Sequence, residues 1–213
     1  MAEPRELRIV PRFVDRGAVI IIEALTGIFI KLGLTPNAVS LLGLPVSFAA
    51  AYALYRGRPL AAFLLGAACG GLDMLDGRIA ARTGRRTRFG ALLDSSLDRY
   101  AEFAFYLALA VRFRDRWPLW AAFAAFLGST MVSYVRARAE GLGFECKIGI
   151  MQRADRFLVL GLACLVAAIF PVFDQAMTAA LVLIASVSNL TAIQRIWLIR
   201  RLDRTTPPKG DRI

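Results

Sequence analysis

Long apolar stretches, separated by short polar segments, repeat along most of this chain. Each stretch is about 20 residues long, which is the length of helix that crosses the hydrocarbon core of a bilayer. The pattern predicts six membrane-spanning helices, near residues 37–55, 60–80, 92–111, 118–135, 157–172 and 176–194. The segments between them are too short for a separate soluble domain. We therefore expect an all-α integral membrane bundle that forms one domain over residues 1–213.

Composition and charge support this class and predict an orientation. The chain is 57% hydrophobic with a net charge of +11, and its basic residues gather between the predicted spans, so we expect no nucleic-acid partner. With a cytoplasmic N-terminus, the segments on that side carry 19 Lys and Arg, against 5 in the opposite loops. Since cytoplasmic loops are enriched in Lys and Arg, we expect a multi-pass protein of the cell (inner) membrane with both termini inside. Trp117 and Trp120 then fall at the outer interface, where aromatic belts form.

Two further segments flank the predicted spans. Residues 18–34 are apolar but carry Glu23 and Lys31, so they could form a seventh span or an amphipathic helix lying in the interface. We favour the interfacial helix, because a further span would reverse the charge distribution. Residues 1–34 are therefore predicted as an N-terminal interfacial segment, and the polar residues 202–213 as a disordered tail.

Four aspartates interrupt two of the predicted spans near the cytoplasmic side. Asp73 and Asp76 end the second span, and Asp94 and Asp98 open the third. Residues three or four apart share one face of a helix. The basic segment between the pairs, residues 82–88, is short enough to join two antiparallel helices. The two pairs should therefore face each other, with the site on the cytoplasmic side.

Such a cluster of carboxylates calls for a cation. Four carboxylates near a bilayer are costly and repel one another unless a positive charge lies between them. The chain has no histidine, and Cys69, Cys146 and Cys164 show no paired spacing, so we expect neither a zinc site nor a disulfide framework. Hard divalent cations prefer carboxylate oxygens. We therefore expect one or two ions of Mg²⁺ or Mn²⁺. Two are favoured, because two ions can clamp both oxygens of a phosphoryl displacement.

The aspartates belong to a longer pattern. The string Asp73-x2-Asp76-Gly77-x2-Ala80-x9-Gly90-x3-Asp94-x3-Asp98 resembles the signature of the CDP-alcohol phosphotransferase (phosphatidyltransferase) family. Seven fixed positions agree at the right spacing and in a hydrophobic context. Enzymes of that family displace CMP from a CDP-linked lipid with an alcohol hydroxyl. The resemblance implies metal binding by the four aspartates, with Asp98 also the general base.

The resemblance also implies where the two substrates bind. It assigns contacts with a CDP-diacylglycerol-type lipid to the following positions: Pro36, Asn37, Ala38, Val39, Gly77, Ala80, Ala81, Arg82 and Thr87. Three arginines resemble those that hold the acceptor's phosphate in the branch that makes phosphatidylinositol phosphate: Arg136, Arg153 and Arg195. A phosphorylated polyol is thus the expected acceptor. Inositol 1-phosphate is favoured, and glycerol 3-phosphate is the close alternative.

The chain departs from the family pattern at one position. The family has Arg directly after Ala80, where this chain has Ala81. We expect Arg82, or else Arg85 or Arg86, to supply the missing charge to the CDP phosphates.

Other functional classes account for fewer of these features. A cation-coupled transporter would spread its acids through the membrane depth, whereas these four share one level. A scaffold gives no reason for clustered acids. The spacing Gly66-xxx-Gly70 allows close approach of another helix, which is a weak indication of a homodimer and is equally typical of packing within one subunit.

Overall fold

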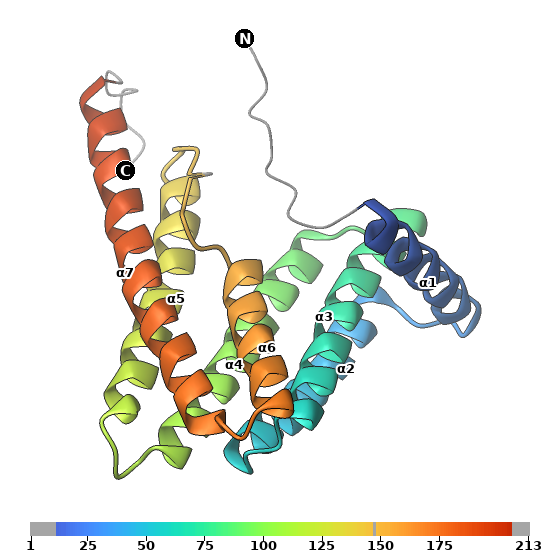
Figure 1. Ribbon diagram of the computed structural model, residues 1–213. Helices are drawn as coiled ribbons and strands as arrows, with labels where there is room; N and C mark the ends of the chain where they lie inside the picture. Colours follow the sequence, from blue (N-terminus) through green and yellow to red (C-terminus); the bar gives the residue numbers. More distant parts are fainter. Residues whose placement is uncertain (1–11, 147, 206–213) are drawn as a thin grey trace.

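The computed structural model describes residues 12–146 and 148–205, and folds them into seven helices (Figure 1). The helices are α1 (Arg12–Lys31), α2 (Pro36–Tyr55), α3 (Pro59–Arg82), α4 (Arg88–Arg112), α5 (Pro118–Gly141), α6 (Arg153–Ile169) and α7 (Phe173–Thr205). Because α7 continues to Thr205, the first four residues of the predicted tail, 202–205, are helical. The remainder of that tail lies outside the described residues.

Within these ranges all secondary structure is helical, which confirms the all-α prediction. Four of the described helices, α2, α3, α5 and α7, are each long and apolar enough to cross a membrane. Helix α4 falls short because of its charged residues, among them Asp94, Asp98 and Glu102. Helix α6 has only 17 residues. Figure 1 shows α4 and α6 running alongside the other four, so the six-span arrangement stays a prediction for these two helices.

Local sequence explains where the helices begin. Thr35 caps α2, because its extended backbone lets its side chain accept a hydrogen bond from the Ala38 backbone N–H at 3.3 Å. Pro36 begins the helix, so Asn37 lies inside its first turn. Thr87 caps α4 in the same way, accepting from the Gly90 N–H at 2.9 Å.

The bundle is built around small side chains. Its core is rich in alanine and is filled out by larger residues such as Phe105 and Leu109. Helix α5 packs closely along α7, and α2 packs against both α3 and α4. Where α5 meets α7, a Cβ on Gly128 would lie 2.6 Å from Asn189 Nδ2, so only glycine fits. A Cβ on Gly66 or Gly70 would meet nothing within 4 Å, so this pair of glycines is not packed against the described part of its own chain.

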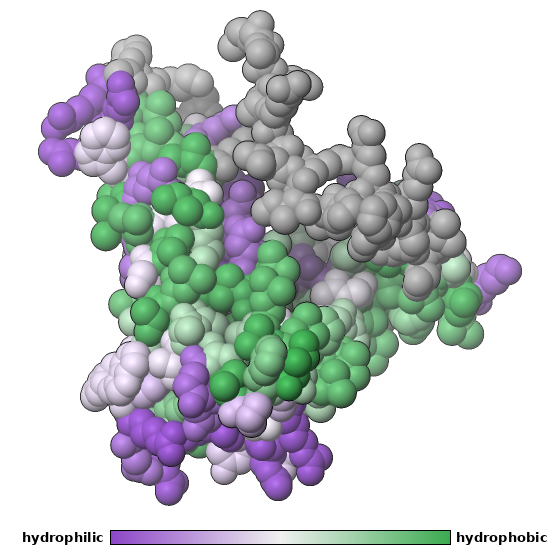
Figure 2. Space-filling view, in the orientation of Figure 1, coloured by the Kyte–Doolittle hydropathy of each residue, from purple (hydrophilic) through white to green (hydrophobic). Residues whose placement is uncertain are grey.

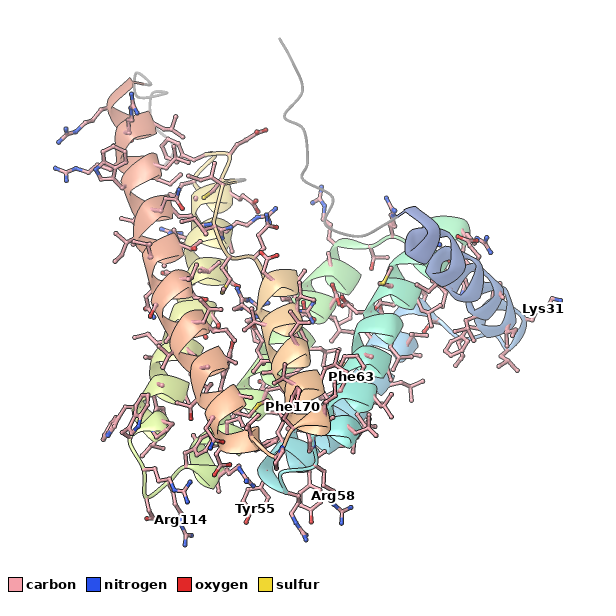
Figure 3. The ribbon with its side chains drawn as sticks, viewed as in Figure 1. Lys31, Tyr55, Arg58, Phe63, Arg114 and Phe170 are labelled. Atoms are coloured by element: carbon pink, nitrogen blue, oxygen red, sulfur yellow. The ribbon has the colours of Figure 1, made fainter. Side chains whose placement is uncertain are left out.

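The surface follows the pattern of a membrane bundle. Figure 2 shows hydrophobic residues across the middle of the molecule and hydrophilic residues gathered at the lower end. Arg58 and Arg114 lie at that lower end (Figure 3), in the α2–α3 and α4–α5 connections. Trp117 and Trp120 are 63% and 71% exposed at the start of α5, and their position at the membrane interface stays a prediction.

Helix α1 lies at one side of the bundle, crosses its direction and packs against the end of α3 (Figure 1). The helix lies within the predicted interfacial segment 1–34 and begins at Arg12, before the apolar stretch 18–34. Glu23 fastens it to α3 through ion pairs with Arg78, at 2.5 Å, and with Arg82. The placement of α1 in the membrane interface remains a prediction.

Candidate active site

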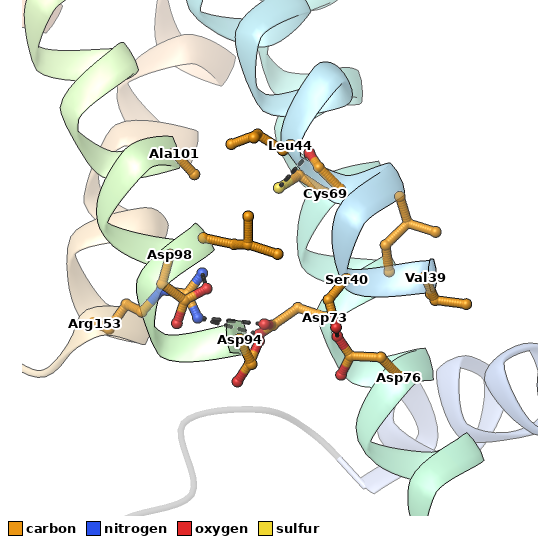
Figure 4. Close-up of a pocket in the computed structure, with 13 residues that line it drawn as sticks. Val39, Ser40, Leu44, Cys69, Asp73, Asp76, Asp94, Asp98, Ala101 and Arg153 are labelled. Carbon is orange, nitrogen blue, oxygen red and sulfur yellow. Dashed lines mark hydrogen bonds and ion pairs between the residues drawn. The ribbon is translucent and has the colours of Figure 1, made fainter. Parts of the chain in front are cut away.

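One pocket collects the four aspartates from helices that meet near one end of the bundle (Figure 4). Its walls come from α2, α3, α4 and the start of α6. The lining residues are Val39, Ser40, Gly43, Leu44, Cys69, Leu72, Asp73, Asp76, Asp94, Leu97, Asp98, Ala101 and Arg153.

The α3–α4 hairpin brings the two acidic pairs together. Helix α3 ends at Arg82 and α4 begins at Arg88, and Gly84 makes the turn with a φ of +66° that favours glycine. One carboxylate oxygen from each of Asp73, Asp76 and Asp94 lies within 4.8 Å of the others. The predicted convergence of the two pairs is therefore confirmed.

The donor set fits a hard divalent cation. Three carboxylates at this separation repel strongly when ionised, and a cation between them removes that repulsion. The clustered ligand atoms are all oxygens, which are the ligands that Mg²⁺ and Mn²⁺ prefer. Asp98 lines the same pocket but lies outside the three-carboxylate cluster, so its surroundings differ from those of the other aspartates.

Arg153 is the basic residue inside this pocket. Its Nη1 lies 3.3 Å and 3.4 Å from the two carboxylate oxygens of Asp73, and its Nη2 forms an ion pair with Asp98. The guanidinium also lies over the ring of Phe157, 5.1 Å from its centroid. Of the three arginines predicted for the acceptor's phosphate, Arg153 is therefore the one that reaches the carboxylates.

The other two predicted arginines have partners outside the pocket. Arg195 is buried, and it donates to the carbonyl oxygens of Ile148 at 2.7 Å and Val132 at 2.6 Å. It thereby fastens the α5–α6 connection to α5 and α7. Arg136 forms an ion pair with Glu140 at 2.8 Å on the exposed side of α5.

Ser40 is a site residue that the sequence did not single out. Its hydroxyl donates to Asp76 Oδ2 at 2.5 Å, which attaches α2 to the carboxylate cluster. The available signal was its place in the chain, since it directly follows residues 36–39 of the predicted donor site. A hydroxyl that donates to a ligating carboxylate fixes the direction of its oxygens.

The predicted donor-binding residues gather at the start of α2 and along the end of α3. A Cβ on Gly90 would lie 3.1 Å from Asn37 Oδ1 and 3.0 Å from Thr87 Oγ1, so the beginnings of α2 and α4 meet there. A Cβ on Gly77 would meet nothing within 4 Å, which leaves the backbone of α3 open to approach. Arg82 does not line the carboxylate pocket and pairs with Glu23 instead.

A second feature that the sequence did not predict is a buried ion pair next to the pocket, between Glu102 on α4 and Arg156 on α6. Arg156 and Glu102 are 1% and 4% exposed, and Arg156 Nε donates to Glu102 Oε1 at 2.7 Å. Arg99 lies between this pair and Asp98, with its Nε 3.7 Å from Glu102 Oε2. The sequence pattern offered no partner for Arg156, because Glu102 lies 54 residues away in the chain.

Known proteins resemble this chain in both sequence and structure. The family model described as CDP-alcohol phosphatidyltransferase matches residues 33–190. Archaetidylinositol phosphate synthase of Pyrococcus horikoshii is 33% identical over 168 residues, which are 78% of this chain and 84% of that protein.

Two solved structures of the Mycobacterium tuberculosis phosphatidylinositol phosphate synthase extend the comparison. The structure with CDP-DAG bound has a TM-score of 0.78 and 30% identity, and the match covers 91% of this chain and 98% of that chain. The structure in complex with manganese and citrate has a TM-score of 0.78 and 29% identity, with 90% and 93% covered.

Proposed function

Since the chain belongs to the CDP-alcohol phosphatidyltransferase family, and so is a membrane enzyme of lipid synthesis, we propose that its acceptor is a phosphorylated polyol. The favoured acceptor is inositol 1-phosphate, and the donor is a CDP-diacylglycerol-type lipid. The products are then a phosphatidylinositol-phosphate-type lipid and CMP. The observation that carries the proposal is the position of Arg153, the first residue of α6, whose guanidinium contacts both Asp73 and Asp98 in the pocket.

In this proposal, Arg153 recognises the negatively charged phosphate of the acceptor. A guanidinium binds phosphate through paired, charge-assisted hydrogen bonds, and a neutral polyol offers it no such partner. The relatives are named as synthases of archaetidylinositol phosphate and phosphatidylinositol phosphate, so their named products carry an inositol phosphate group. Arg136 and Arg195 are proposed to complete the phosphate site. To reach it, Arg136 leaves Glu140, and Arg195 gives up a hydrogen bond to the Ile148 or Val132 carbonyl oxygen.

The aspartates supply the chemistry. Asp73, Asp76, Asp94 and Asp98 are proposed to hold two ions, Mg²⁺ or Mn²⁺, which when bound supply charge neutralisation for the diphosphate and the departing CMP. Asp98 takes the proton from the acceptor hydroxyl as that hydroxyl attacks the β-phosphorus. Ser40 holds the carboxylate of Asp76 in place. Arg153 orients the acceptor so that its hydroxyl lies beside Asp98.

The donor is proposed to lie along the open face of α3. The nucleotide end contacts residues 36–39 and Thr87, and the diphosphate passes Gly77, Ala80 and Ala81. Arg82 replaces the arginine that the family has at position 81, and it does so by exchanging Glu23 for the diphosphate. Breaking the ion pair between Arg82 and Glu23 costs little free energy, because an ion pair between half-exposed side chains contributes about 1 kcal/mol or less to stability.

The membrane arrangement completes the proposal. Six helices, α2 to α7, cross the cell membrane, α1 lies in the cytoplasmic interface, and the pocket opens toward the cytoplasm. The protein acts as a homodimer, for which the uncovered Gly66 and Gly70 offer a place of close contact.

A CMP-release assay on the full-length protein in lipid vesicles tests the acceptor. CDP-diacylglycerol or its ether-linked analogue is supplied with Mn²⁺ and, in separate reactions, inositol 1-phosphate, glycerol 3-phosphate, free inositol or serine. We expect turnover with inositol 1-phosphate to exceed that with free inositol and serine by about 100-fold or more, the equivalent of one lost charge-assisted contact. Asp98→Asn serves as the inactive control. Faster turnover with glycerol 3-phosphate, or equal turnover with free inositol, would overturn the assignment.

A further inference from the structure

The geometry assigns a positioning role to the buried ion pair of Glu102 and Arg156: it fixes α6 against α4 so that Arg153 meets Asp98, and so sets the affinity for the acceptor's phosphate. This inference rests on the proposed function, in which Arg153 contacts that phosphate. Neither Glu102 nor Arg156 lines the pocket, so both act through Arg153.

Two ion pairs join the same two helices, one turn apart. Asp98 and Glu102 are four residues apart on α4, and Arg153 and Arg156 are three residues apart on α6. Residues at these spacings share one helix face, so the pairs Asp98–Arg153 and Glu102–Arg156 lie in parallel. The first pair lies in the pocket, and the second lies beneath it, where Arg156 Nη2 is also 2.7 Å from Glu102 Oε1.

Helices α4 and α6 are joined mainly by side chains. The backbone of α6 packs closely on α3 and α7, whereas it reaches α4 mainly through long side chains. Besides the ion pairs, the rings of Phe105 and Phe157 meet edge to face with centroids 5.6 Å apart. Packing on α3 and α7 sets the general position of α6, and these side-chain contacts fix its start relative to Asp98.

Arg153 is placed where a small movement of α6 would matter. It is the first residue of the helix, next to a capping box in which the Gln152 N–H donates to Asp155 Oδ2 at 2.7 Å. The helix start is thus rigid, and Arg153 moves with it. A misplacement of a substrate-binding group by about 1 Å can lower a rate about 100-fold. The Glu102–Arg156 pair, one helical turn away from Arg153, can therefore govern acceptor binding without touching the acceptor.

The test replaces both partners, because removing one alone would leave an unpaired buried charge. Buried ion pairs exchanged for apolar residues of similar volume usually preserve the fold, so Glu102→Met with Arg156→Met is the main variant. We expect its KM for inositol 1-phosphate to rise about tenfold or more, with the KM for CDP-diacylglycerol and the Kd for Mn²⁺ within about twofold of the original protein. Asp174→Asn is the matched control, since it removes the ion pairs with Arg112 and Arg116 at the other end of the bundle and should leave every constant unchanged.

Arg153→Ala, measured in parallel, separates the two proposals. If Arg153→Ala leaves the KM for inositol 1-phosphate unchanged, the proposed acceptor site is wrong. If Arg153→Ala raises that KM and the double variant does not, only the positioning role is overturned. Should the double variant fail to fold, Glu102→Asp keeps the charge and shortens the reach. A folded Glu102→Asp protein with an unchanged acceptor KM would overturn the inference equally.

Discussion

Removing the hydroxyl of Ser40 is expected to weaken metal binding without disturbing the fold. Ser40 lies on α2, whereas the carboxylate that it serves, Asp76, lies on α3. The 2.5 Å hydrogen bond to Asp76 Oδ2 is the link that fixes the direction of that carboxylate. In Ser40→Ala, Asp76 keeps its charge and loses only this constraint.

The size of the effect follows from the kind of hydrogen bond. A hydrogen bond to a charged group contributes about 1.5 to 3 kcal/mol, and each 1.4 kcal/mol or so corresponds to about a tenfold change in an equilibrium constant. Ser40→Ala should therefore raise the Kd for Mn²⁺ by about 10- to 100-fold, which is also the range typical of lost partners of metal ligands. Asp76→Ala should show the largest effect possible at this carboxylate, which is the loss of both metal binding and turnover.

The assay is a Mn²⁺ titration of the protein in detergent or vesicles, followed by calorimetry or by the electron paramagnetic resonance of free Mn²⁺. CMP release is then measured across Mn²⁺ concentrations. Turnover of Ser40→Ala should recover at high Mn²⁺, because the ligands themselves are intact. Ser40→Thr, which keeps the hydroxyl, should restore most of the affinity.

Ser47→Ala is the matched control. Ser47 lies on the same helix, is fully buried and donates to the Leu44 carbonyl oxygen at 2.7 Å, but it does not line the pocket. Its loss should leave the Mn²⁺ affinity unchanged. A Ser40→Ala protein with a Kd within twofold of the original would refute the role given to this hydrogen bond.

Two further predictions address the proton acceptor and the displaced arginine. Asp98→Asn should reduce CMP release by at least about 100-fold while the CDP-lipid Kd stays within about threefold, because the amide cannot take a proton; retained turnover would contradict the base assignment. Arg82→Ala should raise the KM for the CDP-lipid by about threefold to tenfold, whereas Glu23→Gln, which frees Arg78 and Arg82, should lower it. An unchanged KM in Arg82→Ala would show that the charge missing at Ala81 is not replaced by this residue.

The aspartate site was predictable because every step depended on local chain geometry. Helical spacing puts each pair on one face, and a short loop makes the two helices antiparallel, so Asp73, Asp76 and Asp94 had to converge. The all-α class followed equally from the length of the apolar stretches. These inferences need no knowledge of which helix packs on which.

The partners of the arginines were not predictable from the sequence. Whether Arg82 meets a substrate or Glu23 depends on where α1 docks, and no periodicity in the chain specifies that contact. Ser40 and Glu102 were missed for the same reason, since each is meaningful only beside a residue from a distant helix.

The charged face of α4 has a consequence for how the protein enters the membrane during synthesis. In the proposed six-span arrangement, α4 carries Asp98, Arg99 and Glu102, and each such residue near the centre of a helix costs about 2.5 to 3.5 kcal/mol during insertion by the translocon. On its own, helix α4 would therefore be translocated across the membrane instead of being inserted into it. Insertion together with α3 as a hairpin, followed by capture of its acids by the arginines of α6, would keep it in place, so the residues that form the site also determine whether the chain acquires its topology.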